Sequence, residues 1–459
     1  MSIAEFPLAT FRDPAGSLRF VGDRVLRRVR AGHGEAALGF LRSPLAQQWV
    51  EQGRLIETEF VSEPDGGWTL EHPRVFFPSY PWEWAPSAWS AAAELTLDLC
   101  EALLEQGLIL KDATPLNILF QGTQPVFVDV LSVEARDPQS PLWLAYGQFV
   151  RTFLLPLAAW RFLGWPLAAS MQKRDGYEPA DLAPCLGRWQ RWREPFRSLV
   201  TLPLMLEKNG GAAASRQAQT RQTPEAALAV LKRNLQGLRQ HLRRLDGKPR
   251  ASRWSDYPES ANHYRNEDHE KKRRFVRDAL QAARPRHVLD LGANTGVYSQ
   301  IAAECGAQVV AWDTDLGATE KHWSEARRLH LGVTPLLVNP ARPTPATGWR
   351  NGESLALLDR TQGRFDCVLM LGLIHHLLLA EQIPLEEIAR LLRDLTTSWA
   401  VVEWVPASDP RFVDLLRGRD ELYGHLDEAA FARAVEPHFT VVLREALPNG
   451  RVLFALQGK

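Results

Sequence analysis

The stretch HVLDLGANTGVYSQIAAECGAQVVAWDTD, residues 287–315, decides the fold of the second half of the chain. HVLDL is a short apolar run of the kind that forms a buried strand, and VYSQIAAECG predicts a helix that ends at Gly306. AQVVAWD predicts a second strand that ends in an acid. From about residue 285 onward, short apolar strands alternate with longer helical stretches, which predicts an α/β domain with a parallel sheet.

The turn between the first strand and the helix contains Gly292 and Gly296. Glycine adopts backbone conformations that are closed to other residues and lets the backbone approach a ligand closely. In an open α/β sheet, ligands bind in the crevice at this end of the strands. A glycine-rich turn can also be purely structural or belong to another kind of nucleotide site. The order of strand, turn, helix, strand and acid in this stretch disfavours both of these alternatives.

The spacing Asp290-x-Gly292-x-Asn294-x-Gly296, with Asp313 at the end of the next strand, resembles the motif of class I S-adenosylmethionine-dependent methyltransferases. The resemblance implies a Rossmann-like domain, a mostly parallel sheet with helices on both faces, that binds S-adenosyl-L-methionine. It implies that Asp290 and the glycine-rich backbone hold the methionine end of this cofactor. It also implies that Asp313 accepts hydrogen bonds from both ribose hydroxyls.

Three more positions belong to the expected cofactor site. Asp315 is the alternative to Asp313 as the partner of the ribose. Asn339 follows the third predicted strand, where the resemblance implies a residue that reads the adenine amino group; a simple turn residue is the equal alternative. Leu371 lies in the fourth predicted strand, residues 365–374, and the resemblance places it at the cofactor.

The candidates for catalysis follow the fourth and fifth predicted strands. His375 and His376 stand where the resemblance implies the transferred methyl group, and a histidine there can take a proton from an acceptor hydroxyl or amine. Two adjacent side chains seldom point the same way, so we expect at most one of them to act, and packing against the next helix is the alternative. Glu403 is a second acid–base candidate, and a salt-bridged residue at the rim is the favoured alternative.

The front half contains a second motif, KDATPLNILFQGTQPVFVDV, at residues 111–130. Asp112 and Asn117 stand five positions apart, a predicted hairpin follows, and Asp129 stands at a strand end. This order resembles the catalytic loop of protein kinases, in which the first acid positions the acceptor hydroxyl and the other two residues hold magnesium. Residues 95–107 predict the helix that enters such a loop.

The front half also departs from the kinase pattern. It has no convincing glycine-rich phosphate loop, DVLS replaces DFG, and Arg27 or Arg28 is the only cation in place of the usual strand lysine. These departures favour a degenerate, pseudokinase-like α+β domain that binds an acceptor, a partner or a regulator. The set of Asp112, Asn117 and Asp129 either binds a ligand or metal there or braces the loop by hydrogen bonds.

Length and composition predict a multidomain globular protein. A chain of 459 residues is too long for one core. We expect a degenerate kinase-like domain at 1–205, a linker and amphipathic helix at 206–250, and a methyltransferase domain at 251–459. The 54 basic and 54 acidic residues cancel, which disfavours a nucleic-acid partner. The apolar stretch 152–171 has Arg161 at its centre, so buried helices are expected rather than a membrane span.

The four cysteines are scattered and form no CxxC pair. This pattern disfavours a disulfide framework and a metal site, and it favours the reducing cytoplasm. No signal peptide is expected, because no basic segment followed by an apolar run is found near residue 1.

The combination of DATPLN, LGANTG and LIHHLLL also resembles a bacterial methyltransferase family that includes rhizobial nodulation-type proteins. The leading hypothesis is a methyltransferase that acts on an O or N atom of a small molecule, saccharide or secondary metabolite. In it, the front domain binds the acceptor or a protein partner. The alternatives are a bifunctional kinase–methyltransferase and a non-catalytic scaffold that recruits a partner.

Overall fold

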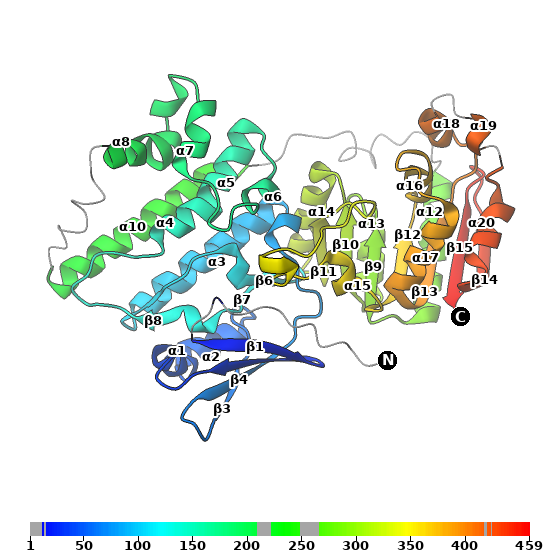
Figure 1. The fold of residues 1–459 in the computed structure, drawn as a ribbon. Coiled ribbons are helices and arrows are strands. Elements are labelled where there is room, and N and C mark those ends of the chain that lie inside the picture. Colours follow the sequence, from blue (N-terminus) through cyan, green and yellow to red (C-terminus); the bar gives the residue numbers. More distant parts are fainter. Residues whose placement is uncertain (1–11, 13–14, 209–221, 248–265, 417–419, 424) are drawn as a thin grey trace. The chain divides into compact units, whose positions relative to one another are not determined.

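The computed structural model describes residues 12, 15–208, 222–247, 266–416, 420–423 and 425–459. The chain divides into two compact units (Figure 1). Unit 1 comprises Met1–Phe120 and Gln124–Pro249, and unit 2 comprises Gln121–Thr123 and Arg250–Lys459. Much of the predicted linker and the first part of the predicted rear domain, residues 209–221 and 248–265, lie outside the described residues.

Unit 2 is built on a seven-stranded sheet with the order β11-β10-β9-β12-β13-β15-β14. The pairs from β11 to β13 are parallel, whereas β15 is antiparallel to both of its neighbours, β13 and β14. The strands are β9 (His287–Leu291), β10 (Gln308–Asp313), β11 (Val333–Leu337), β12 (Phe365–Met370), β13 (Thr396–Trp404), β14 (Phe439–Ala446) and β15 (Val452–Gly458). The predicted α/β fold with a mostly parallel sheet is therefore confirmed.

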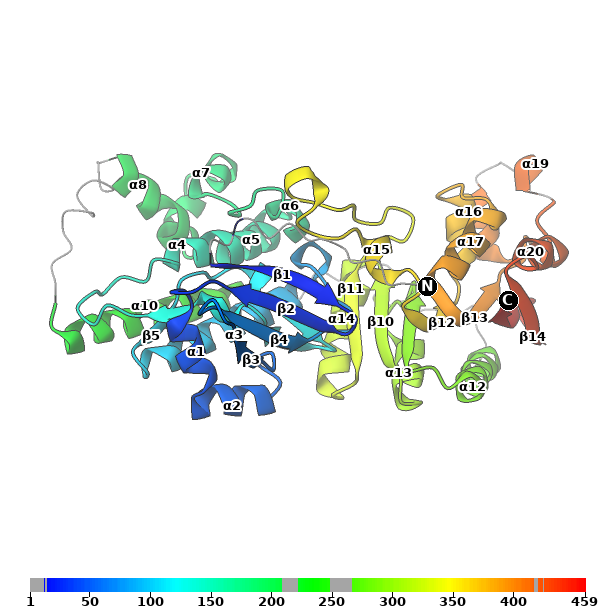
Figure 2. The ribbon, with the colours of Figure 1, turned by 60° about the horizontal axis from the view of Figure 1, so that its bottom comes forward.

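Helices cover both faces of this sheet; Figure 2 shows α12 and α13 on one face and α15 and α17 on the other. Strands buried on both faces read as continuous apolar runs, which is why β9 has four buried residues in five. The helices are α12 (Asn266–Ala283), α13 (Val297–Glu304), α14 (Leu316–Arg328), α15 (Leu357–Thr361), α16 (Ile374–Leu379), α17 (Leu385–Leu395), α18 (Pro410–Leu416), α19 (Asp420–Tyr423) and α20 (Glu428–Val435).

The predicted fourth strand, residues 365–374, is wrong at its carboxyl end. Strand β12 ends at Met370, and Ile374 is already the first residue of helix α16. Gly372 lies between them with a φ of 73°, a left-handed conformation that breaks the extended run. The apolar sequence MLGLI continues through this break, so hydrophobicity alone does not reveal where the strand ends.

Unit 1 is an α+β arrangement. A four-stranded antiparallel sheet has the order β1-β2-β4-β3, and the predicted hairpin after Asn117 is present as the pair β6–β7. Its strands are β1 (Gly16–Val21), β2 (Arg24–Val29), β3 (Glu59–Ser62), β4 (Trp68–Pro73), β5 (Leu108–Leu110), β6 (Ile118–Gln121), β7 (Gln124–Phe127) and β8 (Val133–Ala135). That this unit is kinase-like stays a prediction.

Helices form the rest of unit 1. They are α1 (Glu35–Leu41), α2 (Pro44–Glu51), α3 (Pro86–Leu104), α4 (Tyr146–Phe149), α5 (Leu155–Ala158), α6 (Leu167–Ser170), α7 (Pro179–Leu182), α8 (Leu202–Lys208) and α10 (Pro224–Leu245). The predicted amphipathic helix is α10, which packs on α3 through buried leucines. Its Arg239 also forms ion pairs with Asp98, at 2.8 Å, and Glu101, at 2.9 Å.

The first half of the apolar stretch 152–171 lies in the core of unit 1, where Phe153, Leu154, Leu155 and Leu157 are fully buried, as predicted. From residue 161 onward the stretch is mostly exposed or only partly buried, so the prediction of buried helices does not hold for that half. Within the described ranges, no helix is both long and apolar enough to cross a membrane.

Candidate functional site

Unit 2 contains a cavity of about 790 Å³ beside the carboxyl ends of β9, β10 and β12. This volume lies in the range of cofactor and small-molecule sites, roughly 300–1,000 Å³. Eight of the residues named from the sequence line it: Asp290, Gly292, Asn294, Asp313, Asn339, Leu371, His375 and His376. Three others, Gly296, Asp315 and Glu403, are not among the lining residues.

The glycine-rich turn is tied to the end of the neighbouring strand. The backbone N–H groups of Gly292 and Ala293 both donate to the carbonyl oxygen of Trp312, at 2.9 and 3.0 Å. Asn294 has a φ of 51°, and its backbone N–H donates to Oδ2 of Asp313 at 2.7 Å. These bonds fix the turn and the acid relative to each other at the edge of the cavity.

Asp313 keeps hydrogen-bonding capacity on both carboxylate oxygens. Oδ2 accepts from the backbone of Asn294, and Oδ1 accepts from the backbone N–H of Asp315 at 2.8 Å. A carboxylate oxygen has two lone pairs, so one remains on each oxygen. Burial raises the pKa of Asp313 even though hydrogen bonds from the backbone, those of Asp315 and Asn294 foremost, oppose the shift. The geometry suits a ligand that presents two neighbouring hydroxyls.

Asp315 serves a different purpose. It is the N-cap of α14, and its Oδ1 accepts from the backbone N–H of Ala318 at 2.8 Å. Because this side chain caps a helix and does not line the cavity, Asp313 is the better placed of the two acids.

Asp290 is the buried acid at the end of β9. Its side chain is 2% exposed, and the hydroxyl of Ser299 donates to its Oδ2 at 2.6 Å. Burial raises the pKa of Asp290 to about 6. The group is therefore mainly ionised at pH 7, and it can attract a cationic group in the cavity.

Gly296 shapes the turn and does not line the cavity. Its φ is 88°, and a Cβ at this position would overlap the buried ring of His322. Burial lowers the pKa of His322 to about 3, so this ring is neutral. Only glycine lets α13 start this close to α14.

Asn339 and Leu371 form other parts of the wall. Oδ1 of Asn339 accepts from the backbone N–H of Ala341 at 2.9 Å, which is the turn role that the sequence left open. The asparagine also lines the cavity, so the two roles are compatible. Leu371, at 8% exposure, contributes apolar surface just beyond β12.

His375 and His376 both line the cavity, with their ring centroids 4.3 Å apart. They lie in the first turn of α16, where neighbouring side chains are about 100° apart, and both still reach the same cavity. Position alone therefore does not single out one of the two. Which of them acts, if either does, stays a prediction.

His375 is the more deeply placed of the two. It is 3% exposed, and its Nδ1 makes no hydrogen bond to the part of the chain that the structure describes. Burial lowers the pKa of His375 well below its ordinary value, and the nearby charges of His376, Arg451 and Lys272 lower it further. The imidazole is therefore neutral at pH 7, which is the form that can accept a proton, but the lowered pKa also makes it a weaker base than a free histidine.

Glu403 lies in the core behind the cavity. It is fully buried in β13 and forms ion pairs with Lys272, at 2.7 Å, and with Arg451, at 3.6 Å. The ion pairing agrees with the favoured alternative, but the expected place at the rim is wrong because β13 is an inner strand. Arg451 also bonds Asp409 at 2.8 Å, so two cations and two acids form one buried chain.

Sequence reasoning missed the basic residues that line the cavity, among them Lys272, Arg411 and Arg451. Lys272 stands in the run EKKRRF, which resembles any solvated helix face. Arg451 comes from the turn before the last strand, far along the chain. Only the folded sheet brings these residues together, and no local pattern could have found them.

Two of the three candidate residues of unit 1, Asn117 and Asp129, are linked through the hydroxyl of Ser132. Asp129 pairs with Arg27 of β2 and accepts from the hydroxyl of Ser132 at 2.6 Å, and Nδ2 of Asn117 donates to that same hydroxyl at 3.2 Å. Burial would raise the pKa of Asp129, but the charge of Arg27 and the hydrogen bonds outweigh it and lower the pKa. Burial and the charge of Asp129 raise the pKa of Asp112.

These contacts are those of a braced loop, one of the two roles left open for this set. Over the described ranges, no group of three or more histidine, cysteine, aspartate or glutamate residues is arranged to hold a metal ion. Binding of a ligand at Asp112, Asn117 and Asp129 stays a prediction.

The chain matches no protein-family model. It is 29% identical over 463 residues to nodulation protein NoeA of Rhizobium meliloti (strain 1021), a match that covers 96% of this chain and 94% of NoeA.

Among solved structures, the chain matches N-methyltransferase NodS from Bradyrhizobium japonicum WM9 at 10% identity. This match covers 42% of the chain and 97% of NodS, with a TM-score of 0.31. It also matches the bifunctional kinase-methyltransferase WbdD at 18% identity, covering 42% of the chain and 40% of WbdD, with a TM-score of 0.31. In its motif and its strand order, unit 2 resembles a class I S-adenosylmethionine-dependent methyltransferase, and the whole chain resembles a rhizobial nodulation protein.

Proposed function

We propose that unit 2 is an S-adenosylmethionine-dependent methyltransferase that acts on an O or N atom of a small molecule, saccharide or secondary metabolite. The observation that carries the proposal is Asp313, which has a lone pair remaining on each oxygen at the edge of a cofactor-sized cavity. A ribose presents the two adjacent hydroxyls that such a carboxylate accepts.

The residues around Asp313 fit the rest of this cofactor. Asp290, ionised at pH 7, and the turn that includes Gly292 would hold the ammonium and carboxylate of the methionine end. Asn339 and Leu371 would contact the adenine end of the cofactor. When bound, S-adenosyl-L-methionine supplies an activated methyl group on a sulfonium. Removing the ribose partner should cost about 1–3 kcal/mol of binding free energy.

The protein's own part in the reaction is positioning and proton removal. Holding an acceptor in line can supply about 7–11 kcal/mol of the barrier. His375 is neutral and its Nδ1 makes no hydrogen bond to described residues, so it can take the proton that leaves the acceptor hydroxyl or amine. His376 is the neighbouring alternative. Glu403 would not act directly, because it is buried between two cations.

For unit 1 we propose a pseudokinase-like domain that binds the acceptor or a protein partner. The support is that Asp129, the expected magnesium ligand, is occupied by Arg27 and Ser132. An acid neutralised in this way has little charge left for a cation, which disfavours the bifunctional kinase–methyltransferase.

The proposal is tested by transfer of labelled methyl groups from S-adenosyl-L-methionine to a panel of saccharides and small aromatic acceptors. Once a substrate that accepts the methyl group has been found, His375→Ala should lower kcat by about 100-fold or more, because the side chain that takes the proton is removed. Affinity for S-adenosylhomocysteine should stay unchanged. His376→Ala is the matched control, and a larger loss in that variant would reassign the role. Equal turnover in both variants and the wild type would exclude histidine as the base.

A further inference from the structure

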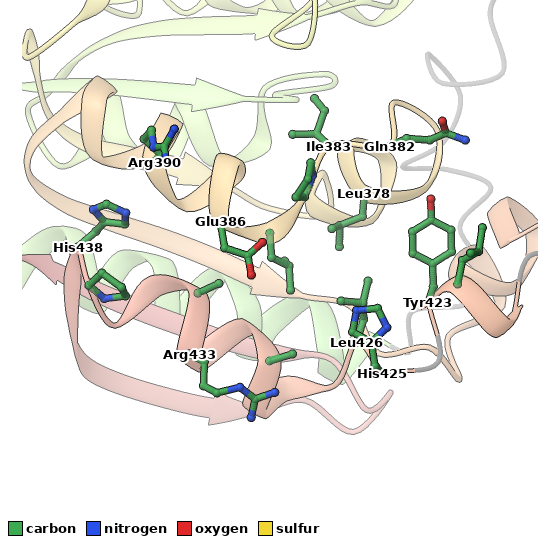
Figure 3. A pocket seen from close by; sticks show the side chains of 16 residues that line it. Leu378, Gln382, Ile383, Glu386, Arg390, Tyr423, His425, Leu426, Arg433 and His438 are labelled. Carbon is green, nitrogen blue, oxygen red and sulfur yellow. The ribbon is translucent and has the colours of Figure 1, made fainter.

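Unit 2 contains a second cavity, of about 730 Å³, that shares no lining residue with the first (Figure 3). Helix α16 and the loop that follows it contribute to both. His375 and His376 line the first cavity, whereas Leu378 and Gln382 line the second. The proposed methyl-transfer site does not use this second cavity.

The second cavity combines an apolar surface with basic groups. Leucines and alanines of α16, α17 and α20 supply the apolar part, for example Leu378, Leu385 and Ala434. In Figure 3, Arg390 and His438 lie toward one end and His425 toward the other, with Glu386 between them. Arg433 of α20 also lines the cavity. The lining of the second cavity therefore includes four basic side chains and one acidic side chain.

Most of these basic groups have no partner within the part of the chain that the structure describes. For the side chains of Arg433, His425 and His438, no hydrogen bond or ion pair to a described residue is found. Arg390 is different, because it pairs with Glu387 at 3.0 Å. An unpaired guanidinium and two unpaired imidazoles beside an apolar surface are complementary to a ligand with an anionic group and an apolar body.

We infer that this second cavity is a binding site for an organic anion, a carboxylate, sulfonate or phosphate attached to an aromatic or aliphatic body. The leucine and alanine surface would take the body, and Arg433 and Arg390 would take the charge. The volume is that of a site for a ligand of small-molecule size. The site lies across α16 from the two histidines, so a bound anion would contact the same helix that carries them.

A fluorescence titration of the full chain with 8-anilinonaphthalene-1-sulfonate tests the inference, since this probe joins an apolar body to one anionic group. S-adenosylhomocysteine is added in excess to occupy the first cavity. Saturable binding is expected, with Arg433→Ala and Arg390→Ala each weakening it about two- to fivefold, the range for a partly exposed ion pair. The double variant should show roughly the product of the two losses. Glu386→Gln should strengthen binding.

Two controls make the outcome decisive. Arg328→Ala removes an exposed arginine of α14 that does not line the cavity, and it should leave the affinity unchanged. The uncharged probe N-phenyl-1-naphthylamine should bind more weakly and respond to neither arginine variant. Equal affinities in wild type and the Arg390/Arg433 double variant, or no saturable binding to the folded chain, would overturn the inference. The arginine variants locate the probe whether or not S-adenosylhomocysteine binds, so this result is independent of the proposed methyl transfer.

Discussion

The two loops that the sequence singles out, one in each unit, both place an acid at the end of a strand, but the acids have different partners. Asp313 of unit 2 is held by backbone N–H groups, and its side chain borders a cavity. Asp129 of unit 1 is held by the side chains of Arg27 and Ser132. Backbone donors fix a carboxylate without cancelling its charge, whereas an arginine neutralises it. Motif spacing therefore finds both acids, and we expect the partner to decide which of them binds a ligand.

The largest effect is expected from Gly296→Ala in the rear loop. The added methyl group would overlap the ring of His322, and alanine would also have to adopt a φ of 88°. Overpacking and backbone strain together should destabilise unit 2 by about 2–4 kcal/mol and weaken cofactor binding. Urea unfolding of the variant measures this change.

Gly306→Ala is the matched control for that substitution. Its φ is 91°, but no atom lies within 4 Å of the added methyl group, so only the strain of about 1 kcal/mol is expected. Equal losses of unfolding free energy in the two variants would show that the close approach of α13 and α14 contributes nothing to the effect of Gly296→Ala.

In the front loop, Arg27→Ala should destabilise unit 1 by about 1–2 kcal/mol, because it leaves the largely buried Asp129 without its cation. The pKa of Asp129 lies below its ordinary value of 3.8. The stabilisation by this pair is therefore complete above about pH 4 and is lost as pH falls through the lowered pKa. Urea unfolding at pH 7 and at pH 3 should show a smaller gap between variant and wild type at the lower pH.

Magnesium with ATP tests whether Asp129 of the front loop is a brace or a metal ligand. If Asp129 serves as a brace, magnesium with ATP should leave the melting temperature of the wild-type chain unchanged. A clear rise in the wild type that Asp129→Asn abolishes would contradict the brace and favour the bifunctional kinase–methyltransferase.

A smaller effect is expected from pH at the rear loop. Asp290 has its pKa raised to about 6, so it is ionised at pH 7 and mainly protonated at pH 5. The affinity for S-adenosylhomocysteine should fall by up to about tenfold over this range, since the ammonium loses its partner. Asp290→Asn should bind weakly at both values, with the pH dependence removed. A steep dependence that persists in Asp290→Asn would assign it to another group.

Sequence patterns predicted much of the rear fold, because its strands and helices follow apolar periodicity; β9 has the predicted bounds. The turn at residues 371–373 was missed because an apolar run hides Gly372. The burial of Glu403 and the pairing of Asp129 with Arg27 depend on contacts between distant segments, which no local spacing encodes.

The most direct test of the contrast between the two loops is a calorimetric titration of the full chain with S-adenosylhomocysteine. Wild type, Asp313→Asn and Asp129→Asn are compared at pH 7. We expect micromolar binding by the wild type, a loss of about tenfold or more in Asp313→Asn, and wild-type affinity in Asp129→Asn. Unchanged binding in Asp313→Asn, or no binding by the folded wild-type chain, would contradict the account.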